Sequence, residues 1–131
     1  MNYVFGAIFT PEDSGGFSVT FPDLEGCHTC GDSLYEAISM AEDLLAFCLY
    51  GYERDRRAIP EPTEIGMLYV EGKQFVSWVA CDTLDYQRRN NTRAVKKTLS
   101  IPEWLNYEAT QKDINFSAVL QEALKEKLNI A

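Results

Sequence analysis

Residues 33–52 carry apolar side chains at the spacing of an α-helix. Ser33, with Glu36 three residues later, fits a capping box at the start of this helix, and Gly51 is placed to help end it. The pattern predicts about five turns with one apolar face, which must pack against another layer of the fold. The residues of this face are Leu34, Ile38, Ala41, Leu45, Cys48 and Tyr52, widened by Leu44 and Leu49.

Extended segments flank the predicted helix. Residues 3–9 are apolar enough for a buried strand, and residues 17–21 alternate strictly between apolar and polar side chains. The turn formers of residues 10–16 predict that these two strands form an antiparallel hairpin. Residues 27–30 can add a short third strand, and residues 73–82, apolar on both faces, predict a central strand. The expected fold class is therefore α+β, with a small antiparallel sheet packed on one long helix in the order ββ(β)αβ.

The chain changes character after this last strand. Residues 83–95 have little hydrophobic periodicity, which predicts a linker. We therefore expect a front domain at residues 1–85, a basic linker at residues 86–95 and a C-terminal domain at residues 96–131.

The net charge of −8 is unevenly distributed along the chain. Residues 1–92 hold six Lys or Arg against fifteen Asp or Glu, whereas residues 93–131 hold six against five. The acidic part would repel nucleic acid and the basic border could attract it, but a solvated linker accounts for this charge equally well. The border carries five positive charges with no acid among them: Arg88, Arg89, Arg93, Lys96 and Lys97.

The last 36 residues predict a strand followed by two helices. Residues 96–101 alternate in character, Pro102 suits the first turn of a helix, and Ser117 can cap a second helix. A unit of this size is too small for a core of its own, so we expect a homodimer in which the lone strand pairs with its copy, and which could assemble further into a tetramer. The side chains expected at the dimer interface are Leu99, Ile101, Trp104, Leu120 and Leu124.

Two cysteines and the only histidine lie together in Cys27-His28-Thr29-Cys30. Structural zinc usually needs two such cysteine pairs, or one pair with spaced histidines, and in an extended segment these two cysteines face opposite sides. A redox pair needs its first cysteine at a helix N-terminus, whereas the predicted helix begins after both. We therefore expect Cys27 to pack as a small apolar residue, and we expect no metal site and no cofactor.

Neither catalysis nor a membrane segment is expected. The acids of the front domain fall on a turn and on an exposed helix side, with no spacing that would bring them together around metal ions, so no residue is assigned a catalytic role. The chain has no apolar run of about 18 residues, and its N-terminal residues lack the features of a signal peptide. We expect a cytoplasmic protein with reduced cysteines.

The C-terminal part resembles the ribbon-helix-helix family of DNA-binding proteins. The matching features are the Lys-x-Leu-x-Ile-Pro segment of residues 97–102 and the Ile-Asn-Phe-Ser-Ala-Val-Leu-Gln-Glu-Ala-Leu segment of residues 114–124. In that family, two copies of the strand pair into a ribbon that enters the major groove of DNA. The resemblance implies base contacts from the alternate strand face, and phosphate contacts at the N-terminus of the second helix. The residues implied are Lys96, Thr98, Ser100, Lys97, Asn115, Ser117 and Arg93.

The front part resembles the HicB antitoxin family. The match runs through Gly-Gly-Phe-Ser-Val-Thr-Phe-Pro-Asp-Leu-Glu-Gly-Cys at residues 15–27, Gly-Asp-Ser-Leu at residues 31–34, and Ile-Pro-Glu-Pro at residues 59–62. The resemblance implies a degenerate ribonuclease H-like domain without activity, and a type II antitoxin that sequesters an RNA-cleaving HicA-like toxin and represses its own operon. It also implies a toxin-facing turn made of Phe21, Asp23, Leu24 and Glu25.

A second interpretation stays open at this point. The chain could be a stand-alone ribbon-helix-helix transcriptional regulator whose front domain binds another protein or a ligand. A short toxin-like reading frame beside this one would favour the antitoxin, and its absence would favour the regulator.

Overall fold

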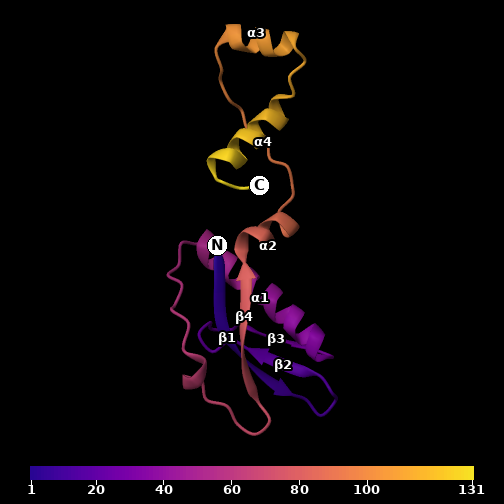
Figure 1. Ribbon diagram of the computed structural model, residues 1–131, viewed down its shortest axis with the longest axis vertical. Coiled ribbons are helices and arrows are strands. Elements are labelled where there is room, and N and C mark those ends of the chain that lie inside the picture. Colours follow the sequence, from indigo (N-terminus) through magenta and orange to yellow (C-terminus); the bar gives the residue numbers. More distant parts are fainter. The chain divides into compact units, whose positions relative to one another are not determined.

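The computed structural model describes residues 1–131, which form two compact units, Met1–Arg93 and Ala94–Ala131. The first unit holds all four strands, a long helix and a short one, and the second holds two helices (Figure 1). No helix is long and apolar enough to cross a membrane.

The first unit is built on one four-stranded antiparallel sheet in the order β3-β2-β1-β4. The predicted hairpin is confirmed, with Phe9 of β1 opposite Val19 of β2. Figure 1 shows α1 lying obliquely along one face of this sheet, and the α+β arrangement is the one expected. The strands are β1 (Asn2–Pro11), β2 (Phe17–Thr20), β3 (His28–Gly31) and β4 (Phe75–Asp82).

The prediction that residues 73–82 form a central strand was wrong, because β4 lies at the edge of the sheet. Its apolar character on both faces has two separate causes. Val79 is buried under α1, whereas Trp78 points to the other face and remains 44% exposed. An exposed tryptophan on one face and a buried valine on the other give the same sequence pattern as a strand covered on both sides.

Helix α1 (Leu34–Arg54) begins where the sequence predicts, since the Ser33 side chain accepts a hydrogen bond of 3.1 Å from the backbone N–H of Glu36. Its buried face is rotated from the predicted one: Leu34 and Ile38 stay exposed, and the buried residues are Ala37, Ala41, Leu45, Ala46 and Leu49. The cause is the close approach of β3, because a Cβ added at Gly31 would lie 2.7 Å from Cα of Ala37. Only small side chains fit at that contact.

Helix α1 continues past Gly51, which was expected to help end it, and its last residue is Arg54. Gly51 does not have a positive φ, so it lies in ordinary helical backbone rather than in a left-handed cap. The chain then runs through the Pro-rich segment and a short 3-10 helix, η1 (Ile65–Met67), before entering β4.

Residues 83–90, for which the sequence predicts a linker, form helix α2 (Thr83–Asn90) in the first unit. The Asp82 side chain caps it by accepting a hydrogen bond of 3.0 Å from the N–H of Leu84. Tyr86 packs against two aromatic rings of α1, with ring centroids 6.3 Å from Phe47 and 5.9 Å from Tyr50. Two turns of helix held by one aromatic residue are too short to produce a recognisable period.

The second unit contains α3 (Glu103–Gln111) and α4 (Phe116–Lys127), and residues 91–102 form neither helix nor strand. Pro102 is the N-cap of α3 rather than a residue of its first turn. The cap of α4 is Asn115, whose side chain accepts a hydrogen bond of 3.0 Å from the N–H of Ala118, so the assignment of this cap to Ser117 was wrong. Asparagine and serine are comparable N-caps, and sequence alone did not separate the two positions.

Candidate functional site

The turn of residues 21–26 was expected to face a toxin, and the structure places its side chains in different environments. Phe21 and Leu24 are 1% and 2% exposed and belong to the core. Asp23 accepts hydrogen bonds from the N–H and Oγ1 of Thr63, at 2.9 and 2.5 Å, and so ties this turn to the segment that follows α1. Glu25 is exposed. Only Glu25 therefore offers its side chain directly to a partner.

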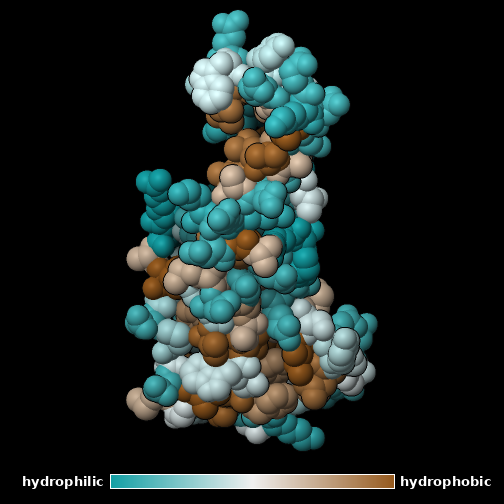
Figure 2. Space-filling model, turned by 45° about the horizontal axis from the view of Figure 1, so that its top comes forward, coloured by the Kyte–Doolittle hydropathy of each residue, from teal (hydrophilic) through white to brown (hydrophobic).

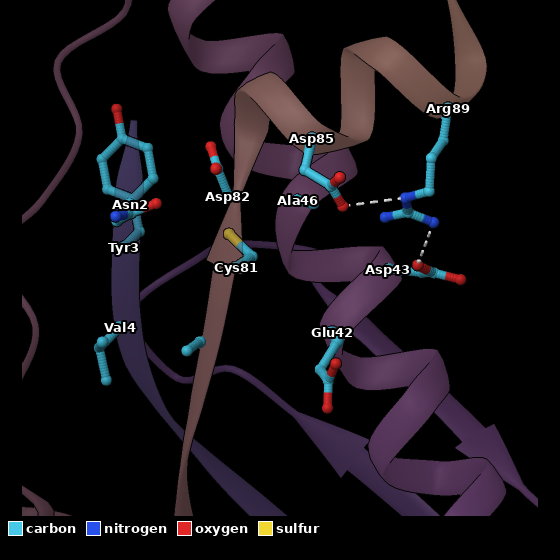
Figure 3. Close-up of a pocket in the computed structure, with 11 residues that line it drawn as sticks. Asn2, Tyr3, Val4, Glu42, Asp43, Ala46, Cys81, Asp82, Asp85 and Arg89 are labelled. Atoms are coloured by element: carbon cyan, nitrogen blue, oxygen red, sulfur yellow. Dashed lines mark hydrogen bonds and ion pairs between the residues drawn. The ribbon is translucent and has the colours of Figure 1, made fainter. Parts of the chain in front are cut away.

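An acidic cleft of about 450 Å³ lies where β1 and β4 meet α1 and α2 (Figure 3). Arg89 reaches across its rim, with its Nε 3.1 Å from Asp85 Oδ2 and its Nη1 3.5 Å from Asp43 Oδ1. Arg89 is thus paired with acids of the first unit, although it is one of the five positive charges of the basic border. The carboxylates that line the cleft are Glu42, Asp43, Asp82 and Asp85.

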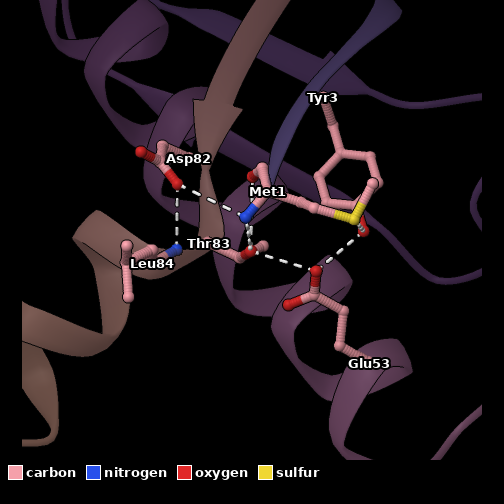
Figure 4. Close-up of polar contacts among 6 residues, drawn as sticks. All are labelled: Met1, Tyr3, Glu53, Asp82, Thr83 and Leu84. Carbon is pink, nitrogen blue, oxygen red and sulfur yellow. Dashed lines mark hydrogen bonds and ion pairs between the residues drawn. The ribbon is translucent and has the colours of Figure 1, made fainter. Parts of the chain in front are cut away.

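The ends of β1, β4 and α1 are joined by a polar cluster (Figure 4). Glu53 accepts hydrogen bonds from the Tyr3 hydroxyl at 2.7 Å and from Thr83 Oγ1 at 3.1 Å. The terminal ammonium of Met1 donates to Thr83 Oγ1 at 3.1 Å and lies 3.6 Å from Asp82. Burial, together with the hydrogen bond to Glu53, raises the pKa of Tyr3 to about 12. The cluster fixes where α2 starts relative to the sheet.

The cysteines are arranged as packing residues. Cys27 is buried with its Sγ 3.1 Å from Sγ of Cys48 on α1, and Cys30 is exposed, so the two cysteines of the Cys-x-x-Cys segment diverge as predicted. The proximity of Cys48 was not predicted, because strand β3 and much of α1 separate the two residues in the sequence. Burial raises the pKa of Cys27, and it raises that of Cys81 to about 11. No three potential ligands of the His, Cys, Asp and Glu types come together.

The second unit carries an apolar groove of about 590 Å³. Lys97, Leu99 and Ile101 line one side of it, so the alternation predicted for residues 96–101 persists without strand pairing. The remaining lining comes mostly from the two helices and includes Leu105, Ala109, Ile114, Phe116, Val119 and Leu120. Figure 2 shows hydrophobic side chains reaching the surface of this unit.

The residues implied for DNA binding lie mostly outside this groove. Lys96, Thr98 and Ser100 alternate with the groove-lining residues and are exposed, as is Arg93. Lys97, by contrast, shares the groove face, and Ser117 also lines the groove. Asn115 is engaged as the cap of α4.

The residues expected at the dimer interface are also only partly brought together. Leu99, Ile101 and Leu120 share the groove, whereas Trp104 and Leu124 are 68% and 51% exposed and are not among its lining residues. Leu105, Ile114 and Phe116 line the groove and were not in the predicted set. Their apolar character was visible in the sequence, but which side of each helix meets residues 97–101 was not.

Comparison with known proteins shows the family. The profile described as "HicB_like antitoxin of bacterial toxin-antitoxin system" matches residues 5–123. "Antitoxin HicB 2" of Photorhabdus laumondii subsp. laumondii is 42% identical over 59 residues, which are 45% of this chain and 42% of that protein. The chain thus matches less than half the length of this curated relative.

Two solved structures share the fold. A "Toxin-Antitoxin complex from Streptococcus pneumoniae" contains a chain that is 26% identical, with a TM-score of 0.63, over 97% of this chain and 99% of that one. A "HicA3 and HicB3 toxin-antitoxin complex" contains a chain that is 18% identical, with a TM-score of 0.50, over 61% and 99%. The profile match extends over most of the sequence, and the chain therefore belongs to the HicB-like antitoxin family.

Proposed function

We propose that this chain is an antitoxin of a type II system, which sequesters an RNA-cleaving HicA-like toxin and represses its own operon by binding operator DNA. The observation that carries the proposal is the profile match to residues 5–123, because it runs through both compact units. One similar structure is a toxin–antitoxin complex, and another is a complex of HicA3 with HicB3.

The charge of the first unit supports a basic protein partner. Residues 1–93 hold seven Lys or Arg against fifteen Asp or Glu. A toxin that binds RNA needs a positive surface, so an acidic antitoxin attracts it and competes with RNA phosphates for the same surface. Within the predicted toxin-facing turn, Glu25 is the exposed group. Phe21, Asp23 and Leu24 act indirectly, by holding the shape of the turn.

The second unit supports dimerisation of the chain. None of its residues is buried, and Leu99, Ile101 and Phe116 are 57%, 46% and 46% exposed beside the groove. When two copies meet, apolar area of this kind is removed from water, and each Å² so buried stabilises the dimer by about 25 cal/mol. A second copy would also supply the strand that residues 96–101 lack, and Leu120 and Leu124 would pack in the same interface.

The exposed face of residues 96–100 supports DNA contact. Lys96, Thr98 and Ser100 point away from the groove, so strand pairing of two copies would bring six such side chains onto one surface. This is the arrangement with which a two-stranded ribbon reads base edges in the major groove. We assign Arg93 and the N-terminus of α4 near Ser117 to phosphates, and Lys97 to the border between the groove and DNA.

We also propose that the first unit performs no catalysis. The four carboxylates of the acidic cleft come from three elements, α1, β4 and α2, and two of them, Asp43 and Asp85, are paired with Arg89. Purified protein should therefore show no magnesium-dependent RNA cleavage above background.

The double variant Lys96→Ala/Thr98→Ala tests the division of labour between the two units. Loss of a base contact costs about 1–3 kcal/mol. Because the dimer carries each substitution twice, the affinity for operator DNA should fall to the affinity for non-specific DNA. Copurification with the neighbouring toxin should be unchanged. Fluorescence anisotropy with operator DNA and affinity copurification measure the two activities.

The matched control is Thr110→Ala/Lys112→Ala, which removes the same two residue types from exposed positions at the end of α3. This control should bind operator DNA like the wild type. Loss of both activities in the Lys96→Ala/Thr98→Ala variant would contradict separate functions for the two units. Wild-type binding should also weaken steeply as salt rises, since phosphate contacts release counterions, and a flat response would exclude Arg93 and Lys96 from binding.

A further inference from the structure

Cys27 and Cys48 come from different parts of the first unit, and the packing of β3 on α1 brings their sulfurs together. Cys27 directly precedes β3, and Cys48 lies on α1. The Cys27 thiol donates a hydrogen bond of 3.1 Å to Sγ of Cys48, and both cysteines are free. A disulfide needs its two sulfurs about 2.05 Å apart, so the pair is about 1 Å from bonding distance.

The register of β3 on α1 holds this pair in place. At the other end of β3, Gly31 packs against α1, where an added Cβ would lie 2.7 Å from Cα of Ala37. An extended chain rises about 3.3 Å per residue, so Cys27 and Gly31 are about 13 Å apart. A helix rises about 1.5 Å per residue, so Ala37 and Cys48 are about 16 Å apart. The two segments cover similar lengths in opposite directions, so the contact at Gly31 also aligns the two cysteines.

The two thiols differ in their access to an oxidant. Cys27 is 2% exposed and belongs to the core, whereas Cys48 is half-buried and packs against that core. Burial, together with the hydrogen bond to Cys48, raises the pKa of Cys27, so this thiol stays protonated at neutral pH. Oxidation of cysteine follows thiolate character and exposure. Cys48 is therefore the sulfur that meets a dissolved oxidant first, and Cys27 is placed to react with it afterwards.

We propose that Cys27 and Cys48 are a site of reversible disulfide formation, with hydrogen peroxide as the oxidant. The Cys48 sulfur attacks one peroxide oxygen and the O–O bond breaks, which leaves a sulfenic acid at Cys48, while the departing hydroxyl takes the Cys48 proton as water. The Cys27 sulfur then attacks Sγ of Cys48 and the S–O bond breaks, while this second hydroxyl takes the Cys27 proton as water. Two thiols are thus oxidised to one disulfide, and the peroxide is reduced to two waters. A dithiol reverses the reaction by thiol–disulfide exchange.

The disulfide fixes the turn of residues 21–26 to α1. Cys27 closes this turn, because its carbonyl accepts a hydrogen bond of 3.0 Å from the N–H of Phe21, and its N–H donates one of 3.2 Å to the carbonyl of Leu24. The new bond also closes a loop that contains β3 and about four turns of α1. Such a cross-link stabilises a fold mainly by restricting the unfolded chain, so the oxidised first unit unfolds at a higher temperature than the reduced one. This inference does not depend on the proposed antitoxin role, because both the bond and the stability are measured without a partner.

Peptide mapping of the full-length wild type tests the proposal. The protein is treated with hydrogen peroxide at neutral pH, its remaining thiols are alkylated, and its peptides are analysed by mass spectrometry. The expected product is a pair of peptides linked through Cys27 and Cys48, which is two hydrogen atoms lighter than the separate peptides and comes apart in a dithiol. A sulfinic acid at Cys48 beside an alkylated Cys27 would overturn the proposal. So would a disulfide that uses Cys30 or Cys81 instead.

The effect on stability is measured in Cys30→Ser/Cys81→Ser, which keeps only the proposed pair. Peroxide should raise the melting temperature of this variant by at least about 10 °C, and a dithiol should restore the original value. The matched control adds Cys48→Ala and keeps every methionine, so any effect of methionine oxidation is the same in both proteins. Its melting temperature should not rise. The wild type, which needs no substitution, should show the same rise as the variant with the pair. An equal rise in the control, or no rise in the proteins that keep the pair, would contradict the stabilising bond.

Discussion

Two glycines of the first unit should respond in opposite ways to alanine. A Cβ at Gly31 would lie 2.7 Å from Cα of Ala37 and 2.8 Å from the carbonyl carbon of Glu36, and both are backbone atoms that cannot rotate away. Overpacking of this kind costs about 1–3 kcal/mol, and contact with backbone places Gly31→Ala near the upper end. Gly51 lies inside α1 with no atom within 4 Å of its Cβ position, so Gly51→Ala should stabilise the first unit by about 0.5–1 kcal/mol.

Urea and thermal unfolding can measure both effects in one background. Trp104→Phe leaves Trp78 as the only tryptophan, so its fluorescence reports the first unit. For a domain of this size, 1 kcal/mol shifts the melting temperature by about 4–8 °C. Gly31→Ala should therefore melt at least about 10 °C below the background protein, and Gly51→Ala a few degrees above it. A Gly31→Ala protein as stable as its parent would refute the close packing of β3 on α1. A destabilised Gly51→Ala protein would refute the placement of Gly51 in the helix interior.

Two further results are expected. Because the pKa of Tyr3 is raised in the folded state, its contribution to stability is complete below pH 10 and is lost as pH rises towards about 12. Over that range the urea midpoint of Tyr3→Phe should therefore fall less steeply than that of the wild type, while both proteins keep the effect of Cys81 between pH 9 and about 11. Identical slopes for the two proteins would exclude Tyr3 as a titrating group. Asn115→Ala should cost about 1 kcal/mol of the stability of α4, measured by circular dichroism, whereas Ser117→Ala should change it far less, and the reverse order would restore Ser117 as the cap.

The predictions from sequence succeeded where one local signal was enough. Strict alternation at residues 17–21 and the turn formers before it identified the hairpin, and Ser33 identified the start of α1. The family also follows from local motifs, and the profile match confirms it. Local patterns fail where position is set by contacts between distant residues.

Such distant contacts decide three features of the first unit. They are the edge position of β4, the burial of Ala37 in place of Ile38, and the pairing of Arg89 with Asp43. Periodicity describes which residues of one element share a face, but it does not say which neighbour that face meets. For the same reason, the sequence showed that the second unit has apolar faces, and it could not show that Trp104 lies away from the groove while Leu105 lines it.

The lack of any buried side chain in residues 94–131 has a consequence for the lifetime of the protein. Ordering a backbone costs about 1–2 kcal/mol per residue, and a segment in which no side chain is fully buried gains little by itself to offset that cost. If the segment dimerises as proposed, its folding is coupled to that association, and its folded fraction rises with the concentration of the chain. Such a dimer would dissociate when the protein is dilute, so proteases should then cleave this segment faster than they do at high protein concentration.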